Sequence, residues 1–148
     1  MPIQQSFQKE IIAFLGEHDI PFSEYTKDTK KLDFVIWNKK RTKQFFFDAK
    51  EKIQRINTNN WRLGDIPEKF AFIIDDLAAR KVLFYAPNSG IVIRDNVYGG
   101  YYFFSVLDLF LMPKRRVNRP IEKMCGVIKE SGLSTCGTAK RLMIWRAC

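Results

Sequence analysis

The fold is decided by the run Leu32-Asp33-Phe34-Val35-Ile36-Trp37, the basic turn Lys39-Lys40-Arg41-Thr42, and the second run Phe45-Phe46-Phe47-Asp48-Ala49-Lys50. Aromatic and β-branched residues dominate both runs, and the polar turn between them predicts a β-hairpin. If residues 39–42 form the loop, Asp33 lies directly across from Asp48, and Lys50 follows two residues on along the same face. A slip of one residue would send the two aspartates to opposite faces, so any joint chemistry depends on this register.

Two carboxylates in cross-strand positions predict a cation site. Their Cβ atoms are about 5 Å apart in such a pair, and their charges repel unless something positive lies between them. Mg²⁺, with Mn²⁺ able to substitute, would bind Asp33, Asp48 and the backbone carbonyl oxygen of Ala49. With Lys50 beside the reacting phosphate, this set is suited to phosphodiester hydrolysis. The alternative is an ion pair of Lys50 with one aspartate and no metal.

A third carboxylate is expected from the first helix. Glu10 lies three residues after Phe7 and four before Phe14, so it borders the apolar face of a helix over residues 3–15. We expect Glu10 to join the aspartates as a catalytic residue and metal ligand. An ordinary solvated position on the helix flank is the alternative.

The composition indicates one folded domain without a membrane span. The chain has 148 residues, 46% of them hydrophobic and 14% aromatic, which is enough for a substantial core. No apolar run is long enough to cross a bilayer, and the first residues lack signal-peptide character. Three cysteines without a Cys-x-x-Cys pair, and one histidine, argue against disulfides or structural zinc. We therefore expect a cytoplasmic protein with no membrane partner, associated with the nucleoid when bound to DNA.

The positive charge is concentrated at one end. The formal net charge is +9, yet residues 1–112 carry 16 basic and 14 acidic side chains, while residues 113–148 carry nine basic and two acidic ones. Such segregation indicates that the C-terminal part faces a polyanion. A basic tail that only keeps the protein soluble is the alternative.

The order of elements predicts a mixed central sheet flanked by helices, an α/β (α+β) fold. Pro120 and Gly132 fit the start and stop of one basic helix, and Ser134 or Thr135 can cap a last helix that carries Lys140, Arg141, Leu142 and Trp145. We therefore divide the chain into a core over residues 1–112 and a basic helical extension over 113–148. Strands are predicted over residues 20–25, 32–37, 44–50, 70–75, 82–85, 91–93 and 101–104, and Ser105 to Asp108 form a capping box that opens a short helix.

The order Glu10, Asp33, Asp48-Ala49-Lys50 resembles the PD-(D/E)xK nuclease superfamily, especially archaeal-type Holliday junction resolvases and compact site-specific endonucleases. The resemblance covers about residues 4–75, and Leu32 stands where the motif has a proline. It implies a restriction-endonuclease-like core, in which a helix precedes a sheet whose central hairpin carries the acidic residue and the (D/E)xK tripeptide. It also implies a metal-dependent nuclease.

Further polar residues are expected to contact DNA from around this core. The hairpin tip lies about 20 Å from Asp33 at the rise of a strand, so we expect it to contact the DNA backbone rather than the reaction. The expected DNA-binding residues are Lys39, Lys40, Arg41, Lys52, Gln54, Arg55, Asn60, Arg115, Arg116, Lys140 and Arg141.

The sequence thus predicts a Mg²⁺-dependent endonuclease for double-stranded DNA, site-specific in the manner of homing or restriction enzymes. A Holliday junction resolvase is the close alternative, because it needs the same core with broader electrostatic contact. A non-catalytic nucleic-acid-binding protein and an RNA-processing nuclease stay open. One site per chain and two strands to cut predict a homo-oligomer, a dimer or a tetramer.

Overall fold

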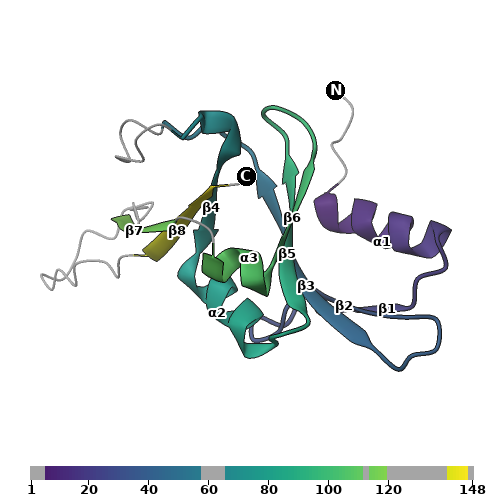
Figure 1. Cartoon of the computed structure of the whole chain (residues 1–148). Coiled ribbons are helices and arrows are strands. Elements are labelled where there is room, and N and C mark those ends of the chain that lie inside the picture. The colour runs from purple at the N-terminus through teal and green to yellow at the C-terminus, as the bar shows by residue number, and fades with distance from the viewer. Residues whose placement is uncertain (1–5, 58–65, 112–113, 120–139, 147–148) are drawn as a thin grey trace, which may run out of the picture.

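The computed structural model describes residues 6–57, 66–111, 114–119 and 140–146, the last two ranges as backbone only. Five strands form a mixed sheet in the order β1-β2-β3-β5-β6, and three form a second sheet in the order β4-β8-β7. Helices flank the larger sheet on both faces (Figure 1), which confirms the expected α+β class. The elements are α1 (Phe7–Glu17), β1 (Phe22–Glu24), β2 (Phe34–Trp37), β3 (Gln44–Lys52), a 3-10 turn (Glu68–Phe70), β4 (Ala71–Asp75), α2 (Asp76–Phe84), β5 (Ser89–Asp95), β6 (Tyr101–Ser105), α3 (Val106–Leu111), β7 (Lys114–Arg119) and β8 (Lys140–Arg146).

Strands β2 and β3 pair in the predicted register. They are antiparallel, and Phe34 lies opposite Phe47. One step further from the turn, the same register sets Asp33 across from Asp48. The stacked rings of Phe34 and Phe47, with centroids 5.2 Å apart, help to hold this alignment.

The turn of the hairpin is closed by one asparagine. The Asn38 N–H donates to the Lys43 carbonyl (3.1 Å), and its side-chain Oδ1 accepts from the Thr42 and Lys43 N–H groups at 2.8 and 3.0 Å. Arg41 has a φ of 53°, in the left-handed region that such a turn requires. The loop over 39–42 is therefore confirmed, and its geometry fixes the register of the strands behind it.

The two faces of the larger sheet carry separate cores. On one face, Phe7, Ile11 and Leu15 of α1 pack against the side chains of Phe34 and Phe47. On the other face, α2 and α3 pack with β4 over β5 and β6. Figure 1 shows α1 on one side of the sheet and α2 with α3 on the opposite side. Side chains along a strand point alternately to its two faces. Phe47 and Ala49 point to the α1 face, so Asp48, which lies between them in sequence, points to the α2 face.

The strand predicted over residues 82–85 is wrong. These residues complete α2, whose buried positions Ala78, Ala79 and Val82 recur at helical spacing. The carboxylate of Asp75 caps the helix by accepting from the Ala78 N–H (2.8 Å). Helix α2 is the crossover that lets β5 lie parallel to β3. A four-residue apolar run alone does not distinguish a strand from the last turn of a helix.

The C-terminal helix predicted from Ser134 or Thr135 onward is also wrong where it is described. Residues 140–146 form β8, which pairs with β4 on one side and with β7 on the other. Lys140, Arg141, Leu142 and Trp145 therefore belong to a strand in the middle of a three-stranded sheet. The helix predicted from Pro120 lies outside the described residues, and the division of the chain at residue 112 stays a prediction.

The capping box before α3 is confirmed. The Ser105 N–H donates to Oδ2 of Asp108 (2.7 Å), and the Asp108 N–H donates back to Oγ of Ser105 (3.2 Å). Within the described part of the chain, no helix combines the length and apolar character needed to cross a bilayer.

Candidate active site

Asp33 and Asp48 meet at the end of the β2–β3 ladder. The last backbone pair is Phe34 with Phe47, and beyond it Oδ2 of Asp33 accepts a hydrogen bond from the Ala49 N–H (3.0 Å). If β2 were longer, one of its backbone carbonyls would accept from the Ala49 N–H. The carboxylate of Asp33 takes the place of that carbonyl. Asp48 projects beside it with 2% of its surface exposed. The structure brings the two predicted carboxylates together.

Burial and the neighbouring carboxyl group of Asp48 shift the pKa of Asp33. Burial, the charge of Asp48 and a side-chain hydrogen bond with Asp48 raise the pKa of Asp33 to about 6, although the Ala49 N–H and Lys50 act in the opposite direction. At mildly acidic pH the pair therefore holds a proton between the two carboxyl groups. Once Asp33 loses its proton above this range, a cation between the two carboxyl groups would relieve the repulsion.

Lys50 lies against the same pair. Its Nζ is 2.7 Å from Oδ2 of Asp48, and 37% of its side chain is exposed. Burial alone would lower the pKa of Lys50, but the charge of Asp48 and its hydrogen bond, with further charge from Asp33 and Asp75, raise it overall. The ammonium is therefore charged at neutral pH, so it can hold a phosphate oxygen and does not act as a base.

Asp75 is a further acidic residue near the site that is not among the residues predicted from the sequence. It ends β4 and caps α2, and its charge acts on Lys50. An Asp75-Asp76 pair directly after a buried strand is a typical helix start, which is the signal that was available. Because the sequence predicts a strand over 82–85, no helix is expected to begin at Asp75-Asp76, and this signal is not recognised.

The donor set fits a hard divalent cation. Within a strand, the N–H and C=O of one residue point to the same neighbour, so the Ala49 carbonyl leaves β3 on the side of Asp33. Two carboxylates and one carbonyl oxygen suit Mg²⁺, which is often held through one or two carboxylates and keeps several waters. Among the described residues, no group of three or more His, Cys, Asp or Glu side chains could hold a metal ion.

Glu10 does not join this set. Its carboxylate is paired with Arg94 and accepts from the hydroxyl of Tyr101, and Arg94 in turn pairs with Glu51. Glu51 and Arg94 are register partners on β3 and β5, on the face that α1 covers. The sequence placed Glu10 correctly at the border of the buried helix face, but the helix packs on the face opposite Asp48. The prediction of Glu10 as a third ligand is therefore wrong.

Lys52 is also not available for DNA. It is 7% exposed, and its ammonium donates to the carbonyls of Glu68 and Lys69 at 2.8 and 3.1 Å. Oδ2 of Asp95 lies 3.6 Å from the same nitrogen. Lys52 thus ties the 3-10 turn to the end of β5, and burial lowers its pKa despite these partners. Lys52 lies on the same face of β3 as Asp48 and Lys50. Its ammonium is nevertheless bound within the protein, because two backbone carbonyls and the carboxylate of Asp95 lie next to it.

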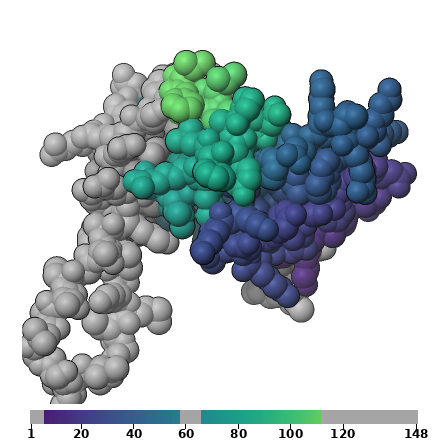
Figure 2. Space-filling view, turned by 90° about the horizontal axis from the view of Figure 1, so that it is seen from below, coloured from purple at the N-terminus to yellow at the C-terminus, as the bar shows by residue number. Residues whose placement is uncertain are grey.

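The remaining expected DNA contacts are dispersed. The hairpin tip projects at one corner of the molecule, away from the adjoining surfaces of α2 and α3 (Figure 2). Gln54 is exposed and lines a cavity together with Lys50. The guanidinium of Arg55 lies 5.9 Å from the ring centre of Tyr98. Lys39, Lys40 and Arg41 are exposed at the tip, Arg115 and Arg116 belong to β7, Lys140 and Arg141 to β8, and Asn60 lies outside the described residues.

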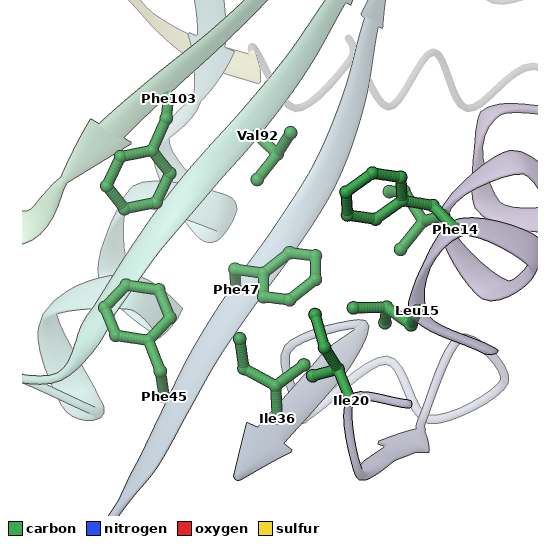
Figure 3. A pocket seen from close by; sticks show the side chains of 9 residues that line it. Phe14, Leu15, Ile20, Ile36, Phe45, Phe47, Val92 and Phe103 are labelled. Carbon is green, nitrogen blue, oxygen red and sulfur yellow. The ribbon is translucent and has the colours of Figure 1, made fainter. Parts of the chain in front are cut away.

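The face opposite the site carries an apolar cavity. Its volume is about 440 Å³, and it lies between α1 and the sheet. Figure 3 shows Phe14 and Leu15 of the helix facing Phe47 and Val92, with Phe103 on the far wall. The described residues that line it carry no charged or polar side chain, so they offer no group for acid–base or metal chemistry.

No protein-family model matches the chain, and no curated protein sequence matches it. Among solved structures, the chain is similar to Hjc, a Holliday junction resolvase of the archaeal hyperthermophile Archaeoglobus fulgidus. The two chains share 9% sequence identity over 68% of this chain and 76% of that chain, with a TM-score of 0.46. At this level of similarity, only the residues of the site themselves carry statements about function.

Proposed function

We propose that this protein is a Mg²⁺-dependent endonuclease that hydrolyses phosphodiester bonds in DNA. The observation that carries the proposal is the cross-strand pair Asp33 and Asp48, two crowded carboxyl groups with the charged Lys50 at 2.7 Å. Acidic side chains are rarely buried together without a positive partner. A purely structural ion pair would need only one of the two aspartates.

The residues divide the task between them. Asp33, Asp48 and the Ala49 carbonyl would hold the ion, which when bound supplies a nucleophilic water and neutralises charge on the phosphate. Lys50 keeps its proton and holds a phosphate oxygen of the scissile bond. The Ala49 N–H orients Asp33 through the hydrogen bond at 3.0 Å. Asp75 keeps a further negative charge near Lys50 and so helps to hold its proton.

The charge of the chain supports a nucleic acid as the substrate. The net charge is +9, and nine basic side chains lie within residues 113–148. Phosphate contacts of this kind supply affinity without sequence preference. The narrower proposal of a site-specific or homing enzyme depended on a helical tail and on the segment near Asn60. Since residues 114–119 and 140–146 are strands, we propose the general DNA endonuclease, with four-way junctions as one candidate substrate.

One site per chain supports a homo-oligomer. Both strands of a duplex, or two arms of a junction, need one site each, and two copies related by symmetry supply them. We therefore propose that the active species is at least a dimer.

A substrate panel tests the proposal. Plasmid, linear duplex, a synthetic four-way junction and single-stranded RNA are incubated with the wild type and Lys50→Ala, with Mg²⁺, Mn²⁺ or EDTA. We expect metal-dependent nicking of DNA by the wild type and loss of cleavage, with binding retained, in Lys50→Ala. DNA binding without cleavage by the wild type in either metal would indicate a non-catalytic binding protein. Cleavage confined to RNA would indicate an RNA nuclease, and cleavage confined to junctions would identify the resolvase alternative.

A further inference from the structure

A small cavity adjoins the proposed active site on the far side of Lys50. Its volume is about 200 Å³, and it lies where the end of β3 passes β4 and β5. Lys50, Glu51, Lys52 and Gln54 line it, together with five apolar side chains that include Ile53, Phe72 and Ile93. Pockets for drug-sized ligands measure about 300–1,000 Å³, so this one has room for a single ring system.

The lining combines apolar walls with one amide and with the charged residues Lys50, Glu51 and Lys52. Ile93 and Phe72 are almost completely buried and belong to the core, so these walls are rigid. Gln54 is exposed, and its side chain offers both a donor and an acceptor. Such a lining suits a planar group that has apolar faces and a hydrogen-bonding edge.

The carboxylate of Glu51 is paired with Arg94 and accepts from Asn96, so its charge is compensated within the protein. Lys52 is held in a similar way. Its ammonium is fixed by the carbonyls of Glu68 and Lys69 and by Asp95. The charge is thereby compensated inside the protein, and Lys50 is the cation at the cavity's active-site end. A ligand of this cavity therefore combines a planar, uncharged body with an anionic group at the Lys50 end.

We propose that the cavity receives one unstacked nucleobase of the DNA strand whose phosphate lies at Lys50. This inference rests on the proposed function, since it takes the phosphate at Lys50 as the scissile one. A nucleotide joins a phosphate to a planar base with two apolar faces and a polar edge, which matches the order of groups from Lys50 to Gln54. The cavity then selects DNA in which a base near the cut is unpaired, because extruding a paired base costs more free energy.

The expected result is a preference for DNA with an unpaired base. In EDTA, so that binding is observed without cleavage, the wild type should bind a duplex with one unpaired 2-aminopurine at least about tenfold more tightly than the fully paired duplex. The fluorescence of 2-aminopurine should change on binding, because its environment changes from the stack to a protein cavity.

Two variants at exposed positions test the cavity itself. Gln54→Ala removes the amide, and Ile53→Trp narrows the opening at a side chain that is 75% exposed, so neither is expected to unfold the protein. Both should reduce the preference to about twofold or less. Gln44→Ala, an exposed glutamine at the hairpin end of the same strand, is the matched control and should keep the full preference.

The outcomes separate this inference from the proposed function. Equal affinity of the wild type for paired and unpaired DNA overturns the inference, even if Mg²⁺-dependent cleavage is present. A preference that Gln54→Ala and Ile53→Trp leave unchanged overturns it as well. If the preference follows the cavity but no metal supports cleavage, the endonuclease proposal fails while the base-binding cavity stands.

Discussion

The two faces of the five-stranded sheet arrange charged groups in opposite ways. On the α1 face, Arg94 lies between Glu10 and Glu51, so two carboxylates share one guanidinium and their charges are compensated within the protein. On the α2 face, Asp33 and Asp48 crowd each other and share one lysine ammonium, and the pKa of Asp33 rises to about 6.

This difference supports a structural role for Glu10 and Glu51 and the proposed catalytic role of Asp33 and Asp48. Arg94 is fixed by two partners, and its pKa is raised overall by Glu51 and Glu10 although burial opposes this. Around Asp33, by contrast, burial and a like charge act together and one positive partner does not offset them. Perturbed carboxyl groups of this kind are concentrated at functional sites.

The largest expected effect is on DNA cleavage, and it distinguishes the α2 face of the sheet from the α1 face. Asp48→Asn should lower Mg²⁺-dependent DNA cleavage by about 1,000-fold or more, because it removes a charge that would hold the ion. Glu10→Gln, the matched change on the α1 face, should alter cleavage by no more than about threefold. Initial rates at saturating Mg²⁺ measure both. An equally inactive but folded Glu10→Gln would show that the α1 face belongs to the site.

The second prediction concerns stability. Arg94→Met should lower the free energy of unfolding by about 2 kcal/mol, since it leaves two carboxylates near each other without their cation. Urea unfolding followed by circular dichroism measures the change. Arg80→Met, which removes an exposed arginine paired with Asp76 on α2, is the control and should stay within about 0.5 kcal/mol. An Arg94→Met protein as stable as the control would contradict a structural role for the α1-face pairs.

A third prediction uses the pH dependence of Asp33. Its folded pKa of about 6 lies above the ordinary value of 3.8, so the folded state binds more protons between these values. Without divalent ions, stability should therefore fall as the pH rises from about 4 to 6. Mg²⁺ at the proposed site would favour ionised Asp33, so it should reduce or reverse this loss. Melting temperatures across this range test it, and Asp33→Asn should remove the dependence on Mg²⁺.

The smallest expected effect concerns DNA affinity. Lys40→Ala at the hairpin tip should weaken DNA binding two- to threefold and reduce the slope of log affinity against log salt by about 1, as for one phosphate contact. Lys9→Ala, an exposed lysine on α1, should leave that slope unchanged. Identical slopes for both variants would remove the hairpin tip from the DNA interface.

The hairpin could be predicted because its signals are local. Aromatic and β-branched residues across 32–37 and 44–50 predict the two strands, and a loop of residues 39–42 between them sets the pairing of Asp33 with Asp48. Asp48 and Lys50 then follow on one face without further information. The short helix after Ser105 was predictable for the same reason, because its cap is formed by residues three positions apart.

The second sheet could not be predicted in this way. Residues 140–146 lack strong strand alternation, and β8 lies between β4 and β7, far from both in sequence. Basic residues in this segment suit a helix by local propensity, but pairing with β4 overrides that preference. The helix over 76–84 was missed because a short apolar run has no clear period.

By itself, then, the sequence determined the hairpin, its register and the meeting of two aspartates with a lysine, since these depend on neighbours a few residues apart across one turn. Only the tertiary structure decided the rest of the site. The packing of α1 on the opposite face directed Glu10 to Arg94, and the contacts of Lys52 with a distant turn removed its charge from the surface. Which face a helix covers, and which acceptors surround a buried ammonium, depend on contacts between distant segments that local sequence patterns do not specify.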